Sequence, residues 1–195
     1  SEYKSALEDY TKAINLNPSN AKYFSCRGSA RYEIGDTSGG IEDDNCAINL
    51  DSSNPEFYWL RGTKKVQLKF FEEAFKDLTF AINLDSKNIK YLQLRGQINM
   101  SLKKYEDAIL DFKHGIKLDP QNASLYHFLG LAKISLKDLT SAILDFTSAI
   151  SLDIQNPDYF MDRAFLQSVL KNYKEAIFDF DSALNLDPNY SSDAY

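Results

Sequence analysis

The chain has 195 residues, of which 44% are hydrophobic and 13% aromatic, so it can bury a core and is not expected to be disordered. The net charge of −6, from 28 acidic and 22 basic residues without any long basic block, would mostly repel a phosphate backbone and argues against nucleic acid as a partner. No apolar run reaches the roughly 18 residues that span a bilayer, and the first ten residues lack the apolar stretch of a signal peptide. We therefore expect a soluble, cytoplasmic protein with no membrane partner.

One short phrase recurs along the chain at a constant interval. Successive copies are 34 residues apart and read AINLN at 13–17, AINLD at 47–51, AINLD at 81–85, GIKLD at 115–119, AISLD at 149–153 and ALNLD at 183–187. A fixed period of this size predicts a solenoid of stacked repeats rather than a single wrapped core.

The period divides residues 1–195 into one array, taken in chain order. Residues 1–20 are the second helix of a partial repeat; the full repeats are 21–54, 55–88, 89–122, 123–156 and 157–190, and residues 191–195 start a further one. In repeat 55–88, apolar residues recur at three- and four-residue spacing in two stretches that are separated near Lys69, which predicts helix, turn, helix, turn. Pro55 and Pro157 each open a first helix, where a missing N–H costs nothing. We expect the chain to be a piece of a longer array whose open ends are covered by further repeats or by neighbours.

Small residues fill two slots of each repeat, a slot being a residue's position counted from the start of its repeat. The eighth slot holds Gly28, Gly62, Gly96, Gly130 and Ala164, and the twentieth holds Gly40, Ala74, Ala108, Ala142 and Ala176. The twenty-fourth slot holds an aromatic such as Phe112, Phe146 or Phe180, and Pro120 and Pro188 stand in the thirty-second. Over its whole length the chain thus resembles the tetratricopeptide repeat (TPR) family. The resemblance implies an all-α, right-handed superhelical solenoid of helix-turn-helix repeats, whose first helices line a concave, peptide-binding groove.

Arginine is confined almost entirely to one slot. Of five arginines, against seventeen lysines, the seventh slot holds Arg27, Arg61, Arg95 and Arg163, whereas the twenty-third slot holds Asp9, Asp43, Asp77, Asp111, Asp145 and Asp179. A planar guanidinium that binds a carboxylate through two hydrogen bonds is the natural reason that lysine does not serve here. We interpret these residues as a structural ion-pair spine. Leu129 interrupts the series, and the sequence leaves open whether each arginine pairs within its own repeat or with the preceding one.

The candidate binding surface is the stripe of each first helix that hairpin packing does not need. Its second, fifth, ninth and twelfth slots share one helical face, and the predicted groove residues are Trp59, Gln93, Gln97, Met100, His127, Leu131, Ile134, Met161 and Phe165. Apolar members would hold an extended or helical apolar peptide, while the glutamines would hydrogen-bond its backbone. The alternative is that superhelical curvature buries this strip as core.

Two details qualify the resemblance. Family members that clamp the acidic C-terminal tails of heat-shock chaperones use Asn or Arg in sixth slots, where this chain has Cys26, Leu60, Leu94, Phe128 and Asp162; chaperone tails are therefore not expected as ligands. Repeat 21–54 has Thr37, Gly40 and Asp44 where aromatic residues and alanine are usual, so its hairpin should be the weakest. The alternative for this repeat is a hinge or a docking patch in which Glu42, Asp43 and Asp44 meet a basic partner.

No group of residues indicates catalysis, a cofactor or a metal. His114 and His127 lack ligand partners at zinc-site spacing, Cys26 and Cys46 are read as reduced thiols, and there is neither a catalytic triad nor a phosphate loop. We interpret the chain as a non-catalytic protein–protein interaction scaffold, or adaptor, that binds an apolar-anchored segment of a partner. Two alternatives remain: an architectural array that self-associates end to end, or the substrate-recruiting arm of an enzyme whose catalytic domain lies outside this chain.

Overall fold

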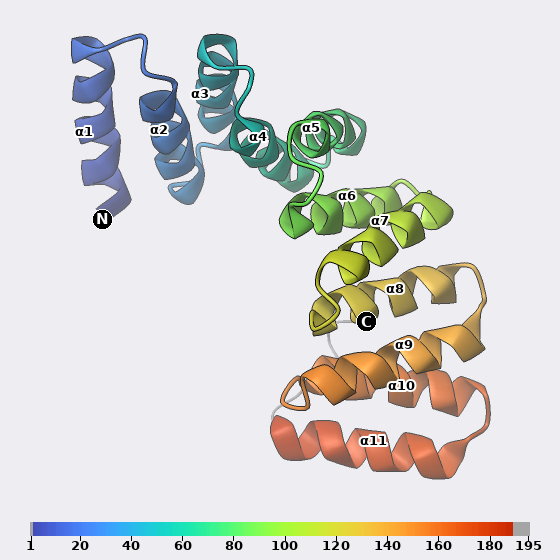
Figure 1. Ribbon diagram of the computed structural model, residues 1–195. Helices are drawn as coiled ribbons and strands as arrows, with labels where there is room; N and C mark the ends of the chain where they lie inside the picture. Colours follow the sequence, from blue (N-terminus) through green and yellow to red (C-terminus); the bar gives the residue numbers. More distant parts are fainter. Residues whose placement is uncertain (1, 189–195) are drawn as a thin grey trace. The chain divides into compact units, whose positions relative to one another are not determined.

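A computed structural model describes residues 2–188, which form eleven α-helices joined by short turns (Figure 1). The chain divides into two compact parts, residues 1–102 and residues 103–195, called here the N-terminal and the C-terminal half and described separately. The border falls inside the expected repeat 89–122, between its two helices. The expected further repeat at 191–195, and the last two residues of repeat 157–190, lie outside the described residues.

The N-terminal half contains six helices, in which α2 packs on α3, α4 on α5, and each helix pair on the next. The bounds are α1 Glu2–Leu16, α2 Ala21–Glu33, α3 Thr37–Leu50, α4 Pro55–Gln67, α5 Phe71–Leu84 and α6 Ile89–Ser101. The first helices α2 and α4 also touch each other, as do α4 and α6.

The C-terminal half continues the same alternation in its described residues, with α8 packed on α9 and α10 on α11. Its helices are α7 Tyr105–Leu118, α8 Ala123–Ser135, α9 Leu139–Leu152, α10 Pro157–Val169 and α11 Tyr173–Leu186. The predicted all-α fold class is confirmed, and the sequential packing of helix pairs is that of TPR proteins.

The recurring AINLD-type phrase lies at the junction between repeats. Its last residue directly follows one helix, and an asparagine three residues later caps the start of the next helix. Asp51 follows α3, and its carboxylate accepts a hydrogen bond from the Ser53 N–H at 3.0 Å. Asn54 then caps α4, because its side-chain oxygen accepts a hydrogen bond from the Glu56 N–H at 3.0 Å. Asn20, Asn88 and Asn156 cap their helices in the same way. These side chains replace hydrogen bonds that helix ends lack.

The turn inside each hairpin uses a left-handed residue in the fifteenth slot. Gly35 has φ 88°, but Lys69, Lys103, Lys137 and Lys171 adopt φ values from 58° to 65° at the same slot. Lysine is strained in this region, yet its charge lies near the negative end of the preceding helix, which favours a cation there.

Glycine allows a close helix crossing in the N-terminal half. A Cβ on Gly28 of α2 would lie 2.9 Å from the carbonyl oxygen of Gly40 of α3, and a Cβ on Gly40 would lie 2.8 Å from that of Gly28. Backbone meets backbone at this crossing, so neither position has space for a side chain.

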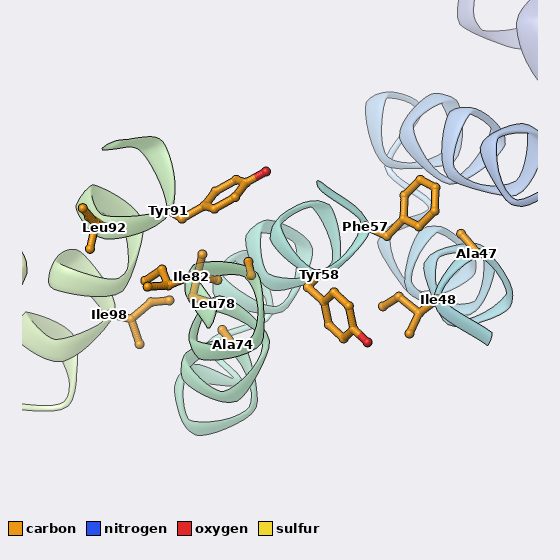
Figure 2. Packing of buried hydrophobic residues seen from close by; sticks show 11 residues of the cluster. Ala47, Ile48, Phe57, Tyr58, Ala74, Leu78, Ile82, Tyr91, Leu92 and Ile98 are labelled. Atoms are coloured by element: carbon orange, nitrogen blue, oxygen red, sulfur yellow. The ribbon is translucent and has the colours of Figure 1, made fainter. Parts of the chain in front are cut away.

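The core of the N-terminal half is continuous from α3 to α6. Figure 2 shows Ala47 and Ile48 of α3 beside Phe57 and Tyr58 of α4, and the α5 side chains continue the cluster toward α6. Burial of such side chains stabilises each by about 1.5–3 kcal/mol before the entropy cost. The same apolar cluster therefore joins successive helix pairs as well as the helices within a pair.

Candidate functional site

In the N-terminal half, three predicted groove residues gather around one open pocket. Trp59 of α4 and Gln93 and Gln97 of α6 line a space of about 210 Å³, together with Thr63, Lys90 and Leu94. The Trp59 side chain is half-buried, with its ring centroid 6.2 Å from that of Tyr91. Met100, also half-buried, does not line this pocket.

In the C-terminal half, the predicted groove residues are mostly packed against their neighbours. Phe165 is 43% exposed and meets Phe180 edge to face, with ring centroids 5.6 Å apart. Leu131 and Ile134 are half-buried against the cluster of Ala142, Phe146 and Leu166. For Leu131 and Ile134, the alternative that the groove stripe is buried as core fits better than an open apolar strip does.

Two predicted groove residues, Met161 and His127, are held in contacts between helices. Met161 is only 8% exposed and belongs to the core with Tyr159 and Phe160, because α9 and α11 supply apolar partners around it. His127 is half-buried, and its Nε2 lies 2.5 Å from Oδ2 of Asp162. That contact joins α8 to α10, so His127 connects two repeats rather than facing open solvent.

A larger groove lies where α1, α2 and α4 meet, within the N-terminal half. Its volume is about 580 Å³, and it is lined by Glu2, Tyr3, Ala6, Tyr10, Lys22, Ser25, Cys26, Ser29, Ala30, Glu33, Asn54, Glu56, Phe57 and Leu60. Lys22, Ser25 and Ser29 stand in the second, fifth and ninth slots of their repeat, which belong to the groove stripe, but the sequence did not indicate α1 as a wall. The signal that could have revealed it is the row Tyr3, Ala6 and Tyr10, which lies on one face of α1.

Three of the seventh-slot arginines pair within their own repeat. The Nε atoms of Arg27, Arg61 and Arg163 donate hydrogen bonds to Asp43, Asp77 and Asp179 at 2.9, 3.0 and 2.8 Å, and each Nη2 donates to the second carboxylate oxygen. Arg61 also donates to Asn45 and Arg163 to Thr147, both on the second helix of the preceding repeat. Arg61 and Arg163 thus each join three helices. Both parts of the question that the sequence left open apply to these two arginines, because each binds the aspartate of its own repeat and also a polar side chain of the preceding repeat.

The remaining members of the spine differ. Asp9 is exposed beside Lys12, 3.5 Å away, and Asp111 is buried. The Arg95 guanidinium lies 6.0 Å from the centre of the Phe75 ring. Asp145 lacks a seventh-slot arginine because Leu129 stands there, and Lys133, one helical turn later, approaches it at 2.5 Å instead. Burial raises the pKa of Asp145, and Lys133 partly offsets that rise.

Sequence reasoning missed a second, fully buried ion pair. Lys64 Nζ of α4 lies 2.8 Å from Oδ2 of Asp44 on α3, with side-chain exposures of 2% and 0%. The Lys64 stem fills the space beside Gly40, where a Cβ would lie 3.0 Å from its Cε, and Nζ lies 5.8 Å from the centre of the Tyr32 ring. Gly40 and Asp44, read from the sequence as signs of a soft repeat, therefore form the socket for one lysine.

Within residues 2–188 no helix is long and apolar enough to cross a membrane. Over the same residues, His, Cys, Asp and Glu side chains form no group of three or more that could hold a metal ion.

Comparison with known proteins places this arrangement in a family. A model described as TPR repeat matches residues 1–35 and 96–136, and one described as tetratricopeptide repeat matches residues 123–156 and 158–190. No curated protein matches the sequence significantly.

Several solved structures share the fold. MamA of Desulfovibrio magneticus RS-1 superposes with a TM-score of 0.81 at 19% identity, over 88% of this chain and 97% of that one. YrrB, described as a TPR protein with an unusual peptide-binding site, gives 0.76 at 19% identity over 94% and 95%. TTC0263, a TPR protein of Thermus thermophilus, gives 0.68 at 16% identity over 87% and 92%. At these identities the structures show the fold alone, but together with the matching family models they confirm that the chain belongs to the tetratricopeptide repeat family.

Proposed function

We propose that this chain is a non-catalytic scaffold that holds an apolar-anchored segment of a partner protein, with Trp59 as the main anchor. TPR proteins mediate protein–protein interactions, and they are typically non-catalytic.

The observation that carries the proposal is the position of Trp59. Its large ring is only half-buried, and it borders an open pocket together with the amide groups of two glutamines. A partly exposed tryptophan is a frequent anchor in protein interfaces, and amides can pair with the backbone of an extended peptide. In the C-terminal half, the exposed Phe165 offers a second apolar contact.

The test is selection of binders from a random peptide display library on the wild-type chain, followed by measurement of each selected peptide on variants. Trp59→Ala and Gln97→Ala should weaken binding by about tenfold or more. Phe70→Ala is the matched control, because Phe70 is a half-exposed aromatic residue in a hairpin turn, away from the pocket. Unchanged helicity in circular dichroism must accompany each variant. Selected peptides that bind the Trp59 and Gln97 variants as well as the wild type would contradict the proposal.

A second candidate function is self-association through α11. Tyr173 and Ile177 are 59% and 60% exposed, and Leu184 lies on the same helix at 47%, so apolar side chains of this helix remain uncovered among the described residues. Copies that stack through this helix would show a mass that rises with concentration in analytical ultracentrifugation, and Ile177→Glu would keep them monomeric. A monomer at all concentrations would exclude this candidate.

A further inference from the structure

We infer that the groove between α1, α2 and α4 binds a peptide segment in which lysine or arginine side chains alternate with apolar ones. The inference rests on the proposed function, because it assumes that the chain binds partner segments, but it concerns a groove other than the Trp59 pocket.

Apolar and aromatic side chains line part of this groove. Tyr3 and Tyr10 come from α1, and Phe57 and Leu60 from α4. Tyr3 is 47% exposed although it borders the groove, so part of the apolar surface is open to a ligand. The neighbouring Cys26 raises the pKa of Tyr10. A volume of about 580 Å³ lies within the usual range of about 300–1,000 Å³ for ligand sites.

The charged side chains of the groove come from all three helices and are mainly acidic. Glu2 begins α1, Glu33 ends α2, and Glu56 lies in the first turn of α4, whereas Lys22 is the one cation among the lining residues. All three glutamates are exposed, and none of them forms an ion pair with another described residue. The lining therefore has an excess of two negative charges at neutral pH.

Charge complementarity selects the occupant. A low-dielectric cleft lined by one sign of charge concentrates the field at its mouth and favours ligands of the opposite sign. An acidic or uncharged segment would leave the carboxylates beside apolar surface without compensation, while a basic segment would pair with them and place its apolar side chains on Tyr3 and Leu60. Like-charge contact lowers affinity as effectively as an attractive pair raises it.

The experiment uses three synthetic twelve-residue peptides with identical leucine anchors and with four variable positions that are all Lys, all Gln or all Glu. Fluorescence anisotropy with the whole chain gives their affinities, and amide chemical shifts locate the site. We expect the Lys peptide to bind most tightly, with an affinity that falls as salt rises, and to shift amides of α1, α2 and α4. The double variant Glu33→Gln, Glu56→Gln should weaken its binding at least about fivefold.

The matched control removes the same charge from the same part of the chain. Glu8 and Glu72 are exposed and lie outside the groove, so Glu8→Gln, Glu72→Gln should leave the Lys peptide's affinity within about twofold of wild type. The inference is overturned if the Gln or Glu peptide binds as tightly as the Lys peptide, if both double variants lose affinity equally, if the shifted amides lie elsewhere, or if no peptide binds. Library selection on the Trp59 variants decides the proposed function separately, because Trp59 does not line this groove.

Discussion

At the scale of single residues, the buried pair of Asp44 and Lys64 is the least expected feature of the chain. Burial raises the pKa of Asp44 to about 6; the positive charges of Lys64 and Arg61 only partly offset this effect, and the nearby Asp43 adds to it. Oδ1 of Asp44 has no hydrogen-bond partner among the described residues. An ion pair of this kind costs desolvation energy that the attraction between its charges does not fully repay.

The sign of the pH dependence follows from that shift. The folded-state pKa of Asp44 lies above its unfolded value of about 4, so the stability linked to this group is fully present below pH 4 and is lost as the pH rises through 6. The folded-state and unfolded-state pKa of Asp44 thus differ by about 2, which corresponds to about 3 kcal/mol of free energy of unfolding. We expect the variant Asp44→Leu, Lys64→Met, which replaces both charges with side chains of similar size, to have a higher free energy of unfolding than wild type. The difference between the two proteins should grow as the pH rises from 5 to 7.5, because only the wild type loses the stability linked to Asp44.

Urea unfolding of both proteins at a series of pH values checks this prediction, and their difference cancels the titration of the other carboxylates. Lys64→Met alone serves as the control, since it leaves a buried carboxylate without its partner and should destabilise the chain by about 3 kcal/mol at neutral pH. A difference between wild type and double variant that does not change with pH would refute the assignment to Asp44.

The same residues show what sequence can and cannot give at this scale. The confinement of arginine to one slot was visible as a pattern, and three of those arginines lie against an aspartate of their own repeat. The pairing of Lys64 with Asp44 was not visible, because the two residues lie on different helices and each departs singly from the pattern of its own slot. Likewise, Lys133 replaces the missing arginine only because one turn of helix brings it to Asp145.

At the scale of helices, Arg163 connects α10 to α11 and to α9. Arg163→Lys keeps the charge but loses the paired hydrogen bonds to Asp179, so it should cost about 1–2 kcal/mol. Arg163→Met leaves Asp179, whose side chain is 3% exposed, without a partner and should cost about 3–5 kcal/mol. Thermal unfolding measures the order of the two effects. Equal effects would show that charge alone, rather than the planar fork, holds these helices.

Helix placement was more predictable than side-chain exposure. Helices α2, α4, α6, α8 and α10 begin at residues 21, 55, 89, 123 and 157, where the period opens a repeat, because asparagine caps and N-terminal prolines act locally. Exposure of the groove stripe depends on how closely the following repeat packs. Met161 and Trp59 stand in the same slot, yet Met161 is buried and Trp59 lines an open pocket.

At the scale of the whole molecule, an array of repeats has no single cooperative core, because each repeat is stabilised mainly by its neighbours. Among the described helices, α11 packs extensively only on α10, and α1 only on α2. Helix α3 carries Gly39 and Gly40 in its first turn. Each glycine makes helix formation less favourable than alanine would, by roughly 1 kcal/mol. Local opening should therefore begin at the terminal helices and at α3, not uniformly along the chain.

Native-state hydrogen exchange followed by mass spectrometry tests this order. Peptides from α1 and α11 should exchange first, those from α3 next, and those from α5 and α9, which carry alanine in the twentieth slot and pack on both sides, last. Added Lys peptide should slow exchange in α1, α2 and α4 but not in α9, since protection by a ligand reaches the repeats that it touches and their neighbours. Equal exchange of all helices would mean that the chain opens as one unit, and nearest-neighbour stability could then not explain how a ligand stiffens only one part of it.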